Sequence, residues 1–499
     1  MIGGLLQGAG EMLAWPGVLY MLIGIVCGIA VGILPGVGGA GATALLIPVS
    51  YSMDPPHAVG FLMAVALCSG LGGQITSILI NIPGDPPNAA TTLDGYPMSR
   101  QGRAAEALAA ATLASVIGAV IGLALLLAVL PAARSLVLAF SYPEFFMVAF
   151  TGLVMVAALT RGHVFKGLIS VGVGLLIAFI GLDPITAAPR FTFDQLYLWE
   201  GIDIVPALIG LFAGAELLAM FSRRGAPSVE RIAADGRTSR LADGVASTLR
   251  HWKTVIFSSV LGFFTGLIPG LGGTVASFLA YGQAARISPN PEQFGKGAVD
   301  GVIAAEAAND ADRGGGLIPT IVFGIPGGTL MAVLLAGLLL HGVPVGPELL
   351  RDDMDFVYVL VMAALIPRLI AAGLVLVLSR QAIHITRMRG DVLAPIIAVV
   401  AILGVYALNG YMTDVFVMLL FSYVGYGMEK HGFSRVALII ALVLGGLLEQ
   451  SFHQTIETFG LAGFVTRPIA LVLFLLSLLA LFGPALAKLR RRERKAVPV

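Results

Sequence analysis

Charge is what this sequence has least of. Only 12% of its 499 residues are Asp, Glu, Lys or Arg, and 57% are hydrophobic. Soluble domains carry about 25% charged residues. A water-soluble fold of this length would have to expose large apolar patches, which soluble monomers avoid. The composition therefore excludes an ordinary soluble domain and favours a protein of the lipid bilayer.

Motifs for metals, nucleotides and disulfides are also missing. The two cysteines, Cys27 and Cys68, both lie in apolar segments, as small buried hydrophobes do, and no disulfide framework is indicated. The seven histidines are scattered without a His-Glu-x-x-His pair, and no Gly-x-x-x-x-Gly-Lys-Ser/Thr motif is present. A net charge of +1 indicates no nucleic-acid partner. We therefore expect no cofactor and no transport driven directly by ATP.

Long apolar runs are present instead. A spanning helix needs about 20 apolar residues, whereas strands of membrane barrels alternate apolar and polar residues. We therefore expect an all-α, polytopic bundle of transmembrane helices, with residues 1–499 forming one integral membrane domain. Suitable runs are residues 104–130, 164–182, 254–268, 356–378 and 468–482.

The basic residues predict an orientation. No Lys or Arg precedes Arg100, so there is no positive region of a cleavable leader, and a first span near residues 16–34 is expected to direct insertion. Cytoplasmic loops collect Lys and Arg. The main basic clusters lie at residues 222–253 and 488–495, and smaller ones lie near Arg103, Arg161 and Arg380. We place these clusters, and hence the C-terminus, in the cytoplasm.

A glycine pattern occurs twice along the chain. Residues 32–39 read GILPGVGG and residues 266–273 read GLIPGLGG, while residues 72–84 resemble residues 315–327. The first copy ends near basic residues, whereas the second ends in the acidic stretch 348–355, which predicts inverted repeats. The predicted organisation is a first repeat at 17–103, connecting spans and a cytoplasmic loop at 104–253, a second repeat at 254–350, and C-terminal spans with a basic tail at 351–499.

These motifs should interrupt the helices. Proline removes a backbone donor and clustered glycines are poor helix formers. Bare backbone at membrane depth is tolerated only inside the protein or along a wet cavity. Free amides at the resulting helix N-termini suit a carboxylate, and free carbonyls suit Na⁺. Inverted repeats with such breaks are typical of secondary transporters, with the site at the repeat interface. Close helix packing or a simple kink remains the alternative.

Polar residues gather around the second motif of each copy, and polar groups at membrane depth usually mark sites. The residues predicted to bind substrate are Gly36, Gly38, Thr76, Asn81, Pro83, Gly84, Asn88, Thr91, Gly270, Gly272, Asn309, Arg313, Pro326, Gly327 and Thr329. Those predicted to bind the cation are Gly39, Ser77, Asn81, Gly273, Asn309 and Asp310.

Two charged residues allow two interpretations. Arg313 could pair with a substrate carboxylate or form an internal salt bridge with Asp310 or Asp312. Asp94, next to Tyr96 and Pro97, is expected to shape a turn at the membrane edge rather than to bind substrate.

The glycine motifs resemble those of the large membrane subunit of bacterial tripartite tricarboxylate transporters. The resemblance lies in residues 32–39, in Asn81-Ile82-Pro83-Gly84 running into residues 93–98, in residues 266–273, and in residues 294–297 and 306–309 through to 324–327. It implies a secondary transporter of the bacterial inner membrane, energised by Na⁺ or H⁺. It also implies a small four-helix membrane subunit and a periplasmic solute-binding protein that delivers an organic acid.

The chain departs from that family pattern at two places. Asp310-Ala311-Asp312-Arg313 stands where the family has small uncharged residues, and Asp85 follows Pro-Gly. Extra carboxylates repel a trianion, so a differently charged acid is an alternative to a tricarboxylate.

Three other functions compete with this one: a stand-alone carboxylate permease, a channel and an intramembrane enzyme. An enzyme would need a nucleophile with its base, or convergent carboxylates. The dense carboxylate group formed by Asp300, Glu306, Asp310 and Asp312 has no counterpart in the first copy. We therefore predict that the protein is not an enzyme.

Overall fold

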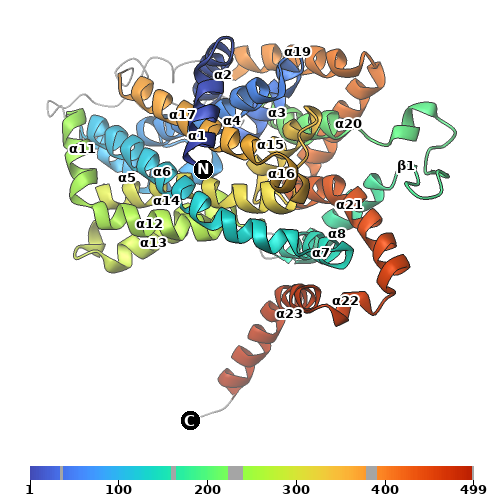
Figure 1. Cartoon of the computed structure of the whole chain (residues 1–499). Coiled ribbons are helices and arrows are strands. Elements are labelled where there is room, and N and C mark those ends of the chain that lie inside the picture. The colour runs from blue at the N-terminus through green and yellow to red at the C-terminus, as the bar shows by residue number, and fades with distance from the viewer. Residues whose placement is uncertain (34–37, 159–163, 223–239, 378–389, 497–499) are drawn as a thin grey trace.

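The described part of the chain is almost entirely helical. The computed structural model describes residues 1–33, 38–158, 164–222, 240–377 and 390–496 (Figure 1). Within these ranges the strands are β1 (Gly181–Leu182) and β2 (Pro189–Arg190). They pair antiparallel in the connection that follows residue 178. The prediction of an all-α helical bundle is confirmed.

Four described helices are long and apolar enough to cross a membrane. They are α4 (Pro55–Ile80), α6 (Ala104–Leu138), α17 (Met354–Val377) and α21 (Arg435–Phe459). α1 (Ile2–Leu13) and α2 (Gly17–Gly32) could form a fifth span, bent by 76° at the break between them.

Other predicted apolar runs are also helical. Residues 164–182 give α8 (Val164–Ala178), residues 254–268 give α12 (Trp252–Gly266), and residues 468–482 begin α23 (Pro468–Ala496). In α12 the glycine and proline motif ends the helix early, because it cannot continue the regular backbone.

The remaining described helices complete the order along the chain. They are α3 (Gly38–Ser50), η1 (Pro86–Asn88), α5 (Ala89–Arg100), α7 (Tyr142–Ala158), η2 (Leu196–Glu200), α9 (Ile204–Ile209), the π-helical η3 (Gly210–Gly214), α10 (Ala215–Ser222), α11 (Leu241–Arg250), α13 (Gly272–Ile287), η4 (Pro291–Gln293), α14 (Val299–Phe323), α15 (Thr329–Leu340), α16 (Pro347–Asp352), α19 (Gly390–Asn409), α20 (Met412–His431) and α22 (Gly463–Thr466).

The two copies of the glycine pattern fold in the same way. α2, α3, α4 and α5 of the first copy correspond in order to α12, α13, α14 and α15 of the second. A side-chain carbon on Gly32 of α2 would collide with the carbonyl oxygen of Ser69, and one on Gly266 of α12 would collide with that of Asp312. Glycine at these positions therefore lets equivalent helix pairs approach backbone to backbone. The boundaries of the repeats and their opposite orientations stay predictions.

The centre of the protein is formed by α4 and α14. From Ala58 to Leu79 and from Gly301 to Val322 every residue of these helices is buried. α4 packs against α2, α3 and α17, while α14 packs against α6, α12 and α13. Because neighbours surround α14 on all sides, it can carry polar and charged residues that lipid would not accept.

Candidate functional site

Three of the four motifs are seen to interrupt a helix. α4 ends before Asn81, which is left-handed with φ 59°, and α14 ends before Gly324, with φ 69°. α12 ends at Gly266, and α13 begins at Gly272 with φ 62°. The predicted breaks are confirmed there. The fourth motif contains Pro35 and Gly36, which lie outside the described residues.

The two breaks within each copy meet. In the second copy the Gly270 N–H donates to the Gly327 carbonyl at 3.0 Å. In the first copy a side-chain carbon on Gly84 would collide with the Gly32 carbonyl, and it would lie 2.6 Å from the Cα of Gly73. Only glycine fits so close an approach.

The breaks of the two copies also lie next to each other. A side-chain carbon on Gly273, at the start of α13, would lie 3.3 Å from Cγ of Pro87 in the break between α4 and α5. The same point lies 2.7 Å from Oδ1 of Asn309 and 3.4 Å from Oδ2 of Asp312. The first copy's loop thus faces the second copy's helix start, as the predicted interface site requires.

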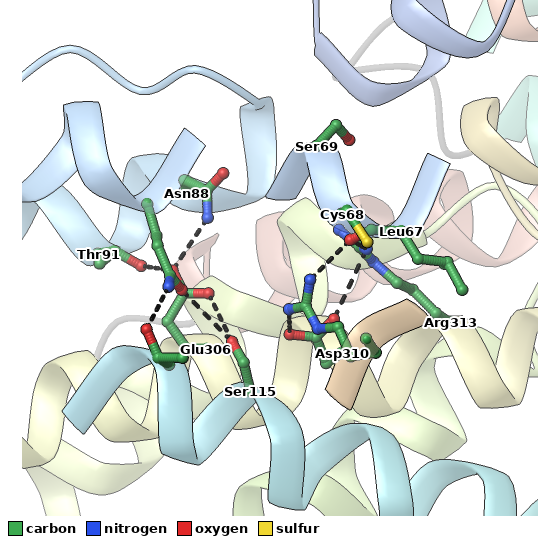
Figure 2. A network of polar contacts seen from close by, with 12 residues as sticks. Leu67, Cys68, Ser69, Asn88, Thr91, Ser115, Glu306, Asp310 and Arg313 are labelled. Carbon is green, nitrogen blue, oxygen red and sulfur yellow. Dashed lines mark hydrogen bonds and ion pairs between the residues drawn. The ribbon is translucent and has the colours of Figure 1, made fainter. Parts of the chain in front are cut away.

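A buried carboxylate of the second copy is held by donors from η1, α5 and α6. Oε1 of Glu306 accepts hydrogen bonds from Nδ2 of Asn88 at 3.0 Å and from Oγ1 of Thr91 (Figure 2). Oε2 accepts one from Oγ of Ser115 at 3.3 Å. Asn88 and Thr91, which the sequence assigns to substrate, are therefore engaged in joining the two copies.

A second buried cluster is built around Asp310. Its Oδ1 lies 3.6 Å from Nη1 of Arg313, and its Oδ2 pairs with Nη2 of Arg368. Both guanidinium groups also donate to the Leu67 carbonyl at 2.6 Å, which links α4, α14 and α17. The internal salt bridge that the sequence left open for Arg313 is present. A cavity beside this cluster is lined by Leu67, Leu123, Asp310, Arg313 and Arg368.

Sequence reasoning missed Arg368. It is a single charged residue in the middle of the apolar run 356–378, and it is 1% exposed. Arginine within a spanning segment nearly always has a buried partner or a role in transport. That rule would have found it.

The expectation for Asp94 is wrong. Asp94 lies within α5, not in a turn, and is fully buried. Its Oδ1 accepts hydrogen bonds from the N–H groups of Gly297 at 2.8 Å and Ala298 at 2.9 Å. The carboxylate therefore caps the N-terminus of α14, whose free amides need an acceptor. The sequence could not reveal this contact because the partners are about 200 positions apart.

The other predicted polar residues differ in burial and in hydrogen bonding. Thr76 and Ser77 are buried, and their hydroxyls donate to the Gly73 carbonyl within α4. Asn81 is exposed at the end of α4, and Thr329 is partly buried at the start of α15. Asn309 is 2% exposed, and its Nδ2 has no hydrogen-bond partner among the described residues.

Gly38 and Gly39 begin α3 close to a carboxylate. Side-chain carbons placed on them would lie 3.1 Å from Oδ1 and 3.4 Å from Oδ2 of Asp85. The Gly39 N–H hydrogen bonds with the same carboxylate. The first helix start is therefore already occupied by an acidic side chain of the protein.

A comparison with known families decides the identity of the chain. The family model described as "Tripartite tricarboxylate transporter TctA family" matches residues 18–440. The chain belongs to the TctA family. The match includes both glycine repeats, and the resemblance of their motifs to this family is confirmed.

Two curated relatives come from Agrobacterium vitis. One, named "Uncharacterized 52.8 kDa protein in TAR-I ttuC' 3'region", is 31% identical over 480 residues, which are 96% of this chain and 95% of the relative. The other, "Uncharacterized protein in TAR-II ttuC' 3'region", is 30% identical over 234 residues, 46% of this chain and 97% of the relative. No solved structure matches significantly.

Membership of the TctA family makes this chain a transporter subunit of the membrane. In this member, the centre combines free helix ends, which attract small ions of either sign, with buried carboxylates. Glu306 and Asp310 are engaged with partners of the protein itself. Asn309, the start of α13 and Asp312 are therefore the groups most available to a ligand.

Proposed function

We propose that this chain is the permease subunit of a secondary tripartite transporter that imports a small organic acid together with Na⁺ or H⁺. A periplasmic solute-binding protein would deliver the acid, and a small four-helix membrane subunit would complete the assembly. The complex would lie in the bacterial inner membrane with the C-terminus of this chain in the cytoplasm. No catalytic step and no cofactor besides the coupling cation belong to this proposal.

The observation that carries the proposal is the contact between the backbone breaks of the two copies. Gly273 at the start of α13 lies against Pro87 in the break after α4. Free amides at a helix start attract carboxylates, and Nδ2 of Asn309 is a buried donor without a partner among the described residues. Together they would bind a substrate carboxylate where the two copies meet.

The charges near this place favour an acid with fewer than three negative charges. Asp310 with Arg313 and Arg368 carries a net charge of +1, which one substrate carboxylate can balance. Asp85 and Asp312 oppose further negative charge, because like charges at short range repel strongly in a low dielectric. Mono- and dicarboxylates are therefore proposed ahead of tricarboxylates.

Uptake in proteoliposomes tests the proposal. The purified chain, reconstituted with its small subunit and the loaded binding protein, should accumulate a radiolabelled mono- or dicarboxylate when a Na⁺ or pH gradient is imposed. Asn309→Leu should abolish accumulation, whereas Asn290→Leu, which alters an exposed loop residue, should leave it intact.

Two results would contradict the proposal. Uptake that neither saturates nor follows a gradient would indicate a channel. Equal uptake without the binding protein would indicate a stand-alone permease.

A further inference from the structure

The three acidic residues in the middle of α14 differ in their surroundings. Glu306 accepts three hydrogen bonds, and Asp310 pairs with two arginines. Asp312 is also buried, with 8% exposure, but its enclosed Oδ1 has no hydrogen-bond partner among the described residues. Of the three, it is the one whose carboxylate has an enclosed oxygen without a hydrogen-bond partner in the described part of the chain.

Such a carboxylate is costly unless something positive compensates it. An ionised group loses its hydration on burial, and a paired charge, a coordinated cation or a bound proton offsets that loss. Arg313 is the adjacent residue, but its guanidinium lies at the Leu67 carbonyl and the Asp310 carboxylate. Asp312 is therefore free to bind a cationic ligand.

An oxygen of Asn309 lies at the same place as Asp312, and a hydroxyl follows on α13. Oδ2 of Asp312 and Oδ1 of Asn309 lie 3.4 Å and 2.7 Å from the point where a side-chain carbon of Gly273 would stand. Ser277 follows one helical turn later on α13, fully buried, and its Oγ has no partner among the described residues. A carboxylate, an amide oxygen and a hydroxyl are ligands of the kind that a small hard cation prefers.

The first copy has a similar arrangement, in which a side-chain carbon on Gly39 would collide with Oγ of Ser69 and lie 3.4 Å from Oδ2 of Asp85. Ser69 is the counterpart of Asp312. Gly32 packs against the Ser69 carbonyl, as Gly266 packs against the Asp312 carbonyl. The Ser69 hydroxyl donates to the Ala66 carbonyl at 2.8 Å. The nearby carboxylate of Asp85 is engaged by the Gly39 N–H. Of the two carboxylates beside these helix starts, only Asp312 has an enclosed oxygen without a partner among the described residues.

We propose that Asp312 binds the coupling cation, a sodium ion, with Asn309 and Ser277 as further oxygen ligands at the start of α13. This cation site rests on the proposed function. It assigns the acidic cation ligand to Asp312, whereas the sequence predicted Asp310. The bound ion would cancel the repulsion between Asp312 and an incoming carboxylate, so that cation and acid bind together.

Thermal unfolding of the purified full-length chain, without substrate, tests the site. Na⁺ is varied against choline at constant ionic strength. Wild type should show a saturable rise in Tm with Na⁺. Asp312→Asn should lose that rise, with the half-saturating Na⁺ concentration raised at least tenfold, and Ser277→Ala should raise it severalfold. Asp352→Asn, at an exposed carboxylate paired with Arg351, serves as the control and should respond like wild type.

The sign of the effect without Na⁺ separates a cation site from a general folding defect. In choline alone Asp312→Asn should have a higher Tm than wild type, because the variant removes an uncompensated buried charge. In saturating Na⁺ the order should reverse. A variant that merely misfolds would have the lower Tm under both conditions, which would overturn the proposal.

Two further outcomes distinguish the site from the proposed function. If wild type shows no Na⁺ response, or Asp312→Asn keeps it, the site is wrong even when carboxylate uptake is observed. If Asp312→Asn abolishes the Na⁺ response while wild type transports no carboxylate, the site stands and the proposed function fails.

Discussion

At the scale of single residues, charge pairing between distant segments defines the centre of this TctA protein. Asp310 on α14 is paired with Arg368 on α17, and both are almost completely buried. Breaking a buried pair leaves one charge without compensation, which is far more damaging than losing a pair at the surface. The pair therefore ties the C-terminal spans to the second repeat.

Arg368→Gln should destabilise the protein by about 3–5 kcal/mol, because Asp310 would keep only the more distant Arg313. The free energy of unfolding in detergent measures this. Arg351→Gln is the matched control, since Arg351 pairs with Asp352 in full contact with solvent. If both variants lost the same stability, the buried pair would have no special role.

Asn81 offers a test between backbone and side-chain roles. Its φ of 59° is accessible to Asn and Gly but strained for other residues. Because the side chain is exposed, we expect the left-handed backbone conformation of Asn81 to matter more for transport than its amide group. Asn81→Gly should therefore keep uptake, and Asn81→Leu should impair it. If Asn81→Gly abolished uptake while the protein stayed folded, the side chain would bind the ligand, as the sequence predicted.

At the scale of elements, glycines set how closely the helices pack. A side-chain carbon on Gly315 of α14 would collide with the Phe263 carbonyl of α12, whereas one on Gly282 of α13 would meet nothing. Backbone cannot yield as a flexible side chain can, and overpacking costs about 1–3 kcal/mol.

Gly315→Ala should therefore lower the free energy of unfolding by about 1–3 kcal/mol. Gly282→Ala should be neutral or add up to about 1 kcal/mol, since alanine is the better helix former. Chemical or thermal denaturation of both variants in one detergent gives the comparison. A neutral Gly315→Ala would show that α12 and α14 are not held this closely.

The elements could be predicted where their causes are local. Proline and clustered glycines end α12 at Gly266 and separate α14 from α15, as the sequence indicated. Asp94 was misjudged because its neighbours Tyr96 and Pro97 suggested a turn, although α5 continues to Arg100. What stabilises Asp94 there is the start of α14, which no local pattern could disclose.

At the scale of the whole molecule, the orientation in the membrane is a prediction from basic residues. Residues 183–203 contain one basic residue, Arg190, and are expected outside. Gln195 precedes η2 in this connection, and Arg250 ends α11 in the basic region expected inside. Both residues are exposed.

In a Cys27→Ser background, Gln195→Cys should react with an impermeant maleimide in right-side-out vesicles. Arg250→Cys should react only after the vesicles are permeabilised. Cys68 is buried and should stay unlabelled in both cases. Labelling of Arg250→Cys in intact vesicles would show that the predicted orientation is wrong.

The sequence by itself determined that this is a helical membrane protein of the TctA family with duplicated helix breaks. Composition, proline and glycine act within a few residues of the chain, so they can be read without coordinates. The tertiary structure alone decided that Arg368 joins Asp310, that Asp94 caps α14, and that Asp312 is left without a partner among the described residues. Those outcomes depend on which distant segments pack together, because a buried charge is stabilised only by groups that the fold brings within a few ångströms.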